Sequence, residues 1–235
     1  MHQYKLKHLN CFSLQNKFTH YNFELNTLAI QFKLMITRNL ASIEAHVWKK
    51  LEEKLPEGLY YHGMHHTREV LESALLIAQM EGVTDKEDLF LLHVACLYHD
   101  LGFIEVYKGH EMRGCEIARA ELPGFGLTEE QIKKICSMII STRLPQSPAT
   151  ELEQIICDAD LYYLGGTDYE TVSETLFKEQ HELGMIKDRD AWNKIQLDFL
   201  QKHNYFTASV KSSHNLGKSM HTKRILGLVN NNKKI

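Results

Sequence analysis

The pattern of hydrophobic and polar positions along the chain is that of successive helices. From about residue 38 onward, apolar residues recur at spacings of three and four, the period of a helix with one buried face. Gly82 ends one such segment, and Thr128 with Gln131 has the spacing of a capping box. Ser147 followed by Pro148 predicts a further helix start. Strand-like alternation is nowhere sustained, so we expect one all-α domain, a multi-helix bundle. The predicted helices cover about residues 38–55, 64–81, 85–101, 110–122, 128–141, 150–163, 168–183, 190–203 and 207–229.

The first residues of the chain differ from the rest. Residues 1–34 carry four lysines against one glutamate and lack the uninterrupted apolar core of a signal peptide. We expect them to be an N-terminal extension that is disordered or not native, read through before a start at Met35. Residues 35–235 are then the folded domain.

Composition excludes several classes of protein. The 235 residues are 43% hydrophobic with a formal net charge of −3, which excludes wholesale disorder and argues against a nucleic-acid polymer as partner. No apolar run reaches the length of a membrane span. Five cysteines form no C-x-x-C pair, and four lie in apolar stretches, which favours buried thiols in a reducing cytoplasm. We therefore expect a cytoplasmic protein without disulfides.

One buried helix ends in two polar residues. The stretch "HVACLYHDLGF", residues 93–103, is apolar on every side before it reaches His99 and Asp100. The C-terminal end of a helix dipole stabilises a charged histidine but disfavours a carboxylate, so a helix end explains His99 and not Asp100. A cation bound by both residues resolves the conflict, because imidazole nitrogen and carboxylate oxygen are ligands for Mn, Fe, Zn or Ni. The pair is therefore either a helix end or a cation site.

A second group of histidines precedes this helix. In "YYHGMHHTREVL", residues 60–71, His62 and His66 are four residues apart and are expected on one helix face. Val70 and Ala74 continue the row of His66, so His66 is expected to point toward the core. The alternative is a polar helix start that is rich in histidine.

A third group contains two acids. In "TELEQIICDADLYYLG", residues 150–165, Asp160 lies at the edge of the apolar stripe, whereas Asp158 lies well away from it and is expected in solvent. An acid beside a buried face needs a partner, which makes Asp160 the better candidate ligand. The stripe consists of Leu152, Ile156, Ala159 and Tyr163.

The three stretches together supply His, His-Asp and Asp from three helices. This order resembles the H…HD…D pattern of the HD-domain superfamily of metal-dependent phosphohydrolases, an all-helical family. The resemblance covers about residues 45–200, through "YHGMHHTREVL", "LYHDLGF" and "DADLYYLG". The segments "STRLPQSP" and "NYFT" are similar to a bacterial subgroup of predicted HD phosphohydrolases. The resemblance implies an HD-type helical bundle over residues 35–235.

The resemblance implies four metal ligands: His66, His99, Asp100 and Asp160. They would hold one divalent transition metal (Mn, Fe, Ni, Co or Zn, with Mg as a further candidate) and leave positions open for water and a phosphate oxygen. Such a metal lowers the pKa of its water and neutralises charge on phosphoryl oxygens. Asp100 would thus serve both as ligand and as part of the catalytic group.

Two further residues are candidates for catalysis. "GHEMRGCEIA" resembles the segment that supplies a histidine to a second ion in dinuclear members, which makes His110 a general acid or a weak ligand. Its alternative is an exposed residue at a helix start. The later histidine of dinuclear members is absent, since Ser141 and Thr142 occupy that region, so one tightly held metal is expected and a second, weaker ion is left open. Arg143 is the preferred phosphate binder, because guanidinium offers a bidentate fork.

One position departs from the family pattern. Phe103 stands where nucleotidase-like members have Glu and signalling phosphodiesterases have Lys. The leading hypothesis is a phosphohydrolase, acting as a phosphomonoesterase or phosphodiesterase on a small phosphorylated compound, expected to be a nucleotide. The alternative is a catalytically idle HD domain that binds a nucleotide or a protein. An HD-family oxygenase ranks last because it needs two irons, and a homodimer is left open.

Overall fold

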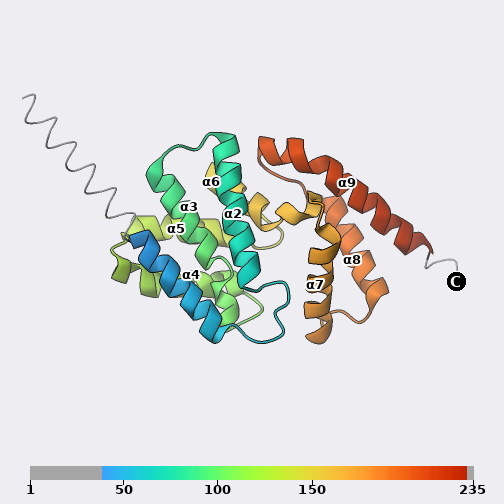
Figure 1. Cartoon of the computed structure of the whole chain (residues 1–235), viewed down its shortest axis with the longest axis horizontal. Coiled ribbons are helices and arrows are strands. Elements are labelled where there is room, and N and C mark those ends of the chain that lie inside the picture. The colour runs from blue at the N-terminus through green and yellow to red at the C-terminus, as the bar shows by residue number, and fades with distance from the viewer. Residues whose placement is uncertain (1–38, 232–235) are drawn as a thin grey trace, which may run out of the picture. The chain divides into compact units, whose positions relative to one another are not determined.

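The computed structural model describes residues 39–231. The predicted extension over residues 1–34 and the start at Met35 lie outside the described residues and stay predictions. The compact unit that contains the helical bundle and the candidate site begins at Ile43. Between residues 39 and 231 the chain contains helices and no strand, which confirms the all-α prediction (Figure 1).

Every predicted helix is present, and within residues 39–231 three short 3-10 helices continue or follow the α-helices. The chain is helical from residue 39 to residue 54 before the first labelled element. The elements that follow are α2 (Met64–Glu81), α3 (Lys86–Tyr98), η1 (Leu101–Ile104), α4 (His110–Glu121), η2 (Leu122–Phe125), α5 (Glu129–Ser141), α6 (Glu151–Asp160), η3 (Tyr162–Gly165), α7 (Tyr169–Glu182), α8 (Arg189–Lys202) and α9 (Ala208–Asn231).

Helix α3 is the centre of the core. It packs against α2 and α5, while α6 packs against α2 and α5 (Figure 1). Every residue from Val94 to Asp100 is buried, as the apolar residues on all sides of this helix predict. The C-terminal end of α3 therefore delivers His99 and Asp100 into the interior.

Two glycines let η1 and α4 approach each other backbone to backbone. A Cβ atom at Gly102 would lie 2.0 Å from the carbonyl oxygen of His110, and one at Gly114 would lie 2.8 Å from that of Tyr98. Only glycine permits contacts this close. The approach places His110, the first residue of α4, beside Asp100.

The C-terminal helices pack on the segment that follows α6. Helix α9 packs along α8 and against η3, and α7 also contacts η3 (Figure 1). A Cβ atom at Gly217 in α9 would lie 2.1 Å from the carbonyl oxygen of Gly165 in η3. This close contact anchors η3, and η3 begins two residues after Asp160.

The predicted start of α6 at Ser147–Pro148 is wrong. The N-cap is Thr150, whose hydroxyl accepts from the backbone N–H of Glu153 at 3.3 Å, while the Glu153 carboxylate accepts from the N–H of Thr150 at 3.2 Å. These two reciprocal bonds fix the helix start three residues later than the proline does. The capping box predicted at Thr128 is confirmed.

Asp158 is buried, so its predicted place in solvent is wrong. Its side chain is 0% exposed and accepts three hydrogen bonds. The donors are the backbone N–H of Phe206 at 2.8 Å, the N–H of Thr207 at 2.8 Å and the hydroxyl of Thr207 at 2.6 Å. The segment before α9 folds over this side of α6, which the periodicity of α6 alone does not reveal. Asp158 is thus an anchor for the C-terminal helices.

Replacing Asp158 by asparagine is expected to lower the free energy of unfolding by about 2 kcal/mol. The asparagine side chain lacks the negative charge that strengthens these three hydrogen bonds. Its N–H₂ group would also face a donor of the protein where the carboxylate offers an acceptor. Urea denaturation measures the change. Asp198→Asn, at an exposed acid paired with Lys202, is the control and should stay within about 0.5 kcal/mol of the wild type. Equal stability of the two variants would contradict the anchoring role.

Two further sequence predictions concern membrane-spanning helices and the state of the cysteines. None of the helices in residues 39–231 is both long enough and apolar enough to cross a bilayer. The four described cysteines are free and buried, as predicted: Cys96, Cys115, Cys136 and Cys157. The cytoplasmic location stays a prediction.

Candidate metal centre

His66 lies in the first turn of α2 and is 4% exposed. Val70 and Ala74, which continue its row along the helix, are 1% and 0% exposed. The prediction that His66 points into the core is therefore confirmed.

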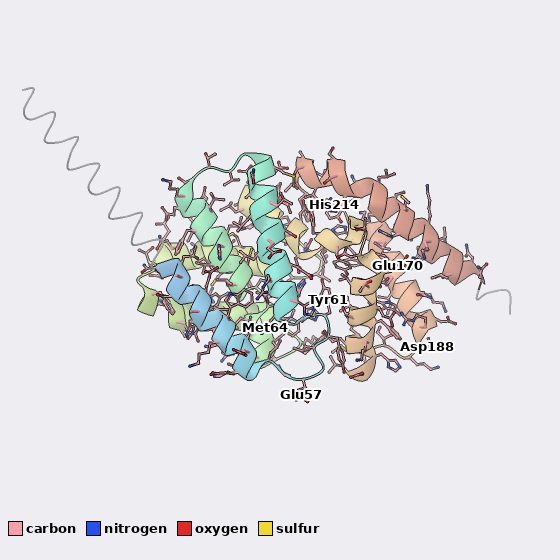
Figure 2. All side chains as sticks on the ribbon, viewed as in Figure 1. Glu57, Tyr61, Met64, Glu170, Asp188 and His214 are labelled. Atoms are coloured by element: carbon pink, nitrogen blue, oxygen red, sulfur yellow. The ribbon has the colours of Figure 1, made fainter. Side chains whose placement is uncertain are left out.

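His62 lies outside this helix, so the prediction that it shares a helix face with His66 is wrong. Helix α2 begins at Met64, and the N-cap Gly63 is extended, with φ −93° and ψ 178°. Figure 2 labels Tyr61 and Met64 at this end of the helix. The ring of His62 still lies beside that of His66, with centroids 5.9 Å apart.

Asp100 does not act as a helix cap. Helix α3 ends at Tyr98, and Asp100 occupies the N-cap position of η1 without a side-chain capping bond. Its Oδ2 atom instead lies 3.5 Å from Nε2 of His66 and 3.3 Å from Nε2 of His99. Asp100 thus faces two imidazoles, and whether the His-Asp pair holds a cation stays a prediction.

Asp160 closes the cluster from a third element. It is the last residue of α6, which is where the predicted helix gives way to η3. Its Oδ1 atom lies 3.1 Å from Nε2 of His66 and 3.8 Å from Nε2 of His99. The ligand atoms of His66, His99 and Asp160 lie within 4.8 Å of one another.

These separations suit one ion. Ligand atoms bound about 2.1 Å from an ion lie roughly 3 Å apart when adjacent and roughly 4 Å apart when opposite. The nitrogen-to-oxygen distances in the cluster run from 3.1 to 3.8 Å. Two imidazoles and two carboxylates form a donor set for Mn, Fe, Co, Ni or Zn.

Two buried atoms in the cluster lack a hydrogen bond. Nε2 of His99 and Oδ2 of Asp100 are buried, and neither has a hydrogen-bond partner among the described residues. The other ring nitrogen of His99, Nδ1, donates to the carbonyl oxygen of Cys96 at 2.8 Å, which leaves Nε2 as the free lone pair. Buried polar atoms are rarely left unpaired, and a cation between these two atoms would satisfy both.

The charges of the cluster also favour a cation. Burial lowers the pKa of His99, but the carboxylates of Asp100 and Asp160 outweigh it and raise this pKa to about 9. Burial would raise the pKa of Asp100, yet the imidazoles of His99 and His110 hold that pKa well below its usual range. A place that stabilises a positive imidazole at 0% exposure also stabilises a metal cation.

His110 is partly buried at the edge of the cluster, so it is not an exposed helix-start residue. Its side chain is 19% exposed, and Nε2 lies 3.4 Å from Oδ1 of Asp100. Nδ1 donates to the carbonyl oxygen of Tyr107 at 3.0 Å, which directs Nε2 toward the cluster. The hydroxyls of Ser141 and Thr142 donate to Met138 and Ile139 of their own helix. His110 therefore faces the cluster, and a second, weaker ion stays open.

Phe103 fills the space between two histidines. Its ring stacks on that of His110, with centroids 3.9 Å apart and an interplanar angle of 20°. On its other side it stacks on His62 at 4.3 Å and 29°. Phe103 thus holds both imidazoles in place by aromatic packing.

Glu179 of α7 is a buried acid that the sequence analysis did not identify. Its side chain is 0% exposed and accepts from the backbone N–H of Tyr61 at 2.9 Å and of His62 at 3.1 Å. It also contacts Nδ1 of His62 and accepts from the hydroxyl of Tyr107 at 3.0 Å. The sequence did contain one indication of this position. Glu179 follows Val172 by seven residues, so the two side chains lie on the same face of α7.

A cavity of about 320 Å³ adjoins the cluster, and Asp100, Asp160 and His110 all line it. Arg143 lines the same cavity, is exposed, and forms no ion pair with any residue in the described range. By contrast, Arg113 pairs with Glu105 and Glu116 on the surface. Arg143 is therefore free to meet an anion bound in this cavity.

These features define a helical protein with a buried cluster of two histidines and two aspartates beside a cavity. Residues 63–163 match the family model of the HD domain, and all four candidate ligands lie within that stretch. Residues 63–163, a little under half of the chain, are thus similar to the HD domain, the all-α domain of a superfamily of metal-dependent phosphohydrolases. No curated protein and no solved structure matches the chain.

Proposed function

We propose that this protein is a metal-dependent phosphohydrolase that cleaves a phosphoester of a small molecule. The observation that supports it is that the side chains of His66, His99, Asp100 and Asp160 contact one another, with two of their buried atoms unpaired. Asp100 and Asp160 also line the cavity. The ligand roles, like the substrate, are part of the proposal. That the substrate is a nucleotide stays a prediction.

The two histidines and two aspartates would hold one divalent ion. When bound, such an ion supplies a lowered pKa for water and neutralises charge on phosphoryl oxygens. The unpaired Nε2 of His99 and Oδ2 of Asp100 are the atoms best placed to become ligands. A mixed nitrogen and oxygen donor set favours Mn, Fe, Co, Ni or Zn over Mg.

Two other residues would act on the substrate. His110, with Nδ1 fixed by the Tyr107 carbonyl, presents Nε2 to donate a proton to the leaving oxygen. Arg143 would bind two phosphoryl oxygens through its guanidinium fork. Asp100 would orient both the ion and His110, since one of its oxygens faces each.

A reconstitution assay tests the proposal. Protein stripped of metal is loaded with each candidate ion and assayed with p-nitrophenyl phosphate, bis(p-nitrophenyl) phosphate and adenosine 5′-monophosphate. Hydrolysis that depends on one added ion supports the proposal. Bound metal without turnover of any phosphoester would contradict it and favour the catalytically idle binding module.

Replacing Arg143 by glutamine is expected to raise KM for a phosphoester by about tenfold with a small change in kcat. The guanidinium contributes a charge-assisted, bidentate contact that glutamine cannot make. Steady-state kinetics measure the change, and Arg113→Gln, at an exposed surface pair, is the matched control. Equal KM values for the two variants would remove Arg143 from the substrate site.

A further inference from the structure

The cavity beside the candidate metal centre has two chemically different walls. One wall is polar and contains Asp100, Asp160 and His110. The other is apolar and includes Leu144, Leu176, Trp192, Ile195, Phe199 and Leu200. A cavity of about 320 Å³ has room for roughly ten non-hydrogen atoms beyond the phosphoryl group.

Most of the apolar wall comes from outside the family match. Leu176 lies on α7, and Trp192 and Phe199 lie on α8, whereas the HD match ends at residue 163. These helices are held in place by η3 and α9. The part of the apolar wall that α7 and α8 form therefore lies outside the matched stretch.

Two residues of this wall are exposed. Leu144 is 56% exposed and Ile195 is 49% exposed, and both line the cavity. Large apolar side chains grouped at a cavity gain from being covered by an apolar group. An apolar ligand in the cavity would cover them.

Two of the polar groups beside the apolar wall already have partners. Oε1 of Gln196 accepts from the hydroxyls of Tyr169 at 2.6 Å and Ser173 at 2.8 Å. The hydroxyl of Thr142 donates to the carbonyl oxygen of Ile139 at 2.8 Å. A nucleobase has several donors and acceptors on its edge, and leaving them unpaired in such a wall costs affinity.

We propose that the substrate is a phosphate ester of an apolar alcohol, with the apolar group seated against α7 and α8. This inference rests on the proposed function. In the reaction, a water oxygen forms the new bond to phosphorus and the bond from phosphorus to the ester oxygen breaks. The ester oxygen leaves with a proton as the alcohol, and inorganic phosphate is the second product, so no oxidant or reductant is needed.

The binding of n-alkylphosphonates from ethyl to decyl tests the inference without requiring turnover. Calorimetry on the metal-loaded protein gives Kd for each, with adenosine 5′-monophosphate for comparison. We expect Kd to fall by about fourfold per added methylene up to roughly octyl and then to level off. We also expect octylphosphonate to bind more tightly than the nucleotide. A Kd independent of chain length, no measurable binding, or tighter binding of the nucleotide would overturn the inference.

A matched pair of variants locates the apolar group. Ile195→Ser is expected to weaken octylphosphonate about tenfold and to weaken ethylphosphonate much less. Leu216→Ser changes an apolar residue that is 74% exposed on α9 and does not line this cavity, so it should bind both ligands as the wild type does. Identical behaviour of the two variants would overturn the placement against α8.

The two levels of the proposal fail in different ways. A chain-length dependence without hydrolysis of any phosphoester would overturn the proposed function and leave the apolar subsite standing. Hydrolysis of p-nitrophenyl phosphate with no chain-length dependence would overturn only the apolar alcohol.

Discussion

Asp100→Asn is expected to lose its bound metal and to lower phosphoester hydrolysis by more than about a hundredfold, a larger effect than the loss of an outer-shell partner. One oxygen of Asp100 lies 3.3 Å from Nε2 of His99, and the other lies 3.4 Å from Nε2 of His110. An amide offers a single, neutral acceptor, so it cannot serve both sides of the cluster. Elemental analysis and initial rates measure the two losses.

The control for this variant is the same change at another buried acid. Asp158 is 0% exposed and bonds only the segment before α9, so Asp158→Asn should keep its metal at temperatures where it remains folded. Equal metal content in the two variants would show that Asp100 is not a ligand.

Glu179→Gln is expected to lower the free energy of unfolding by about 3 kcal/mol at pH 7, the second large effect. This buried carboxylate joins α7 to the chain before α2 through the backbone N–H groups of Tyr61 and His62 and the ring of His62. It also accepts from the hydroxyl of Tyr107, which lies just before α4. Glutamine replaces one charged acceptor oxygen by N–H₂ and leaves buried donors unpaired. Urea denaturation measures the loss.

The effect of Glu179→Gln should depend on pH. Burial raises the pKa of Glu179, but the hydrogen bonds and the neighbouring His62 outweigh it, so this pKa lies below its ordinary value of 4.5. A carboxylate with a lowered folded-state pKa stabilises the protein above its unfolded pKa, and this stabilisation is lost as pH falls through the folded pKa. The difference in stability between wild type and variant should therefore be full at pH 7 and shrink below about pH 4.5.

Glu182→Gln is the matched control on the same helix. Glu182 is exposed and accepts from the hydroxyl of Tyr60 at 2.8 Å, so its replacement should change stability by less than about 0.5 kcal/mol. A loss as large as that of Glu179→Gln, or a pH-independent effect at Glu179, would contradict the buried-carboxylate account.

The helices and the inward position of His66 could be predicted because they depend on local spacing. Residues spaced by four, such as His66, Val70 and Ala74, lie on one face of any α-helix, so the inward position of His66 follows from the apolar residues that continue its row. The capping box at Thr128 is likewise recognised from residues three positions apart. The apolar residues that precede Asp100 likewise indicated that this carboxylate lies in the core.

Asp158 and Glu179 could not be placed in this way because their partners are distant in the chain. Asp158 bonds residues 48 and 49 positions later, and Glu179 bonds residues 117 and 118 positions earlier. His62 was misplaced for another reason, since a single extended residue, Gly63, ends the helical spacing that joined it to His66. The apolar wall of the cavity is also assembled from distant segments, so helical periodicity cannot distinguish it from ordinary core.

The central claim is that His66, His99, Asp100 and Asp160 hold one divalent ion. The most direct test is elemental analysis of protein purified without chelator and then incubated with each candidate ion. The account predicts about one transition-metal ion per wild-type chain and none in a His99→Ala, Asp100→Asn double variant. A wild-type chain that takes up no ion, or a double variant that takes up as much as the wild type, would contradict it.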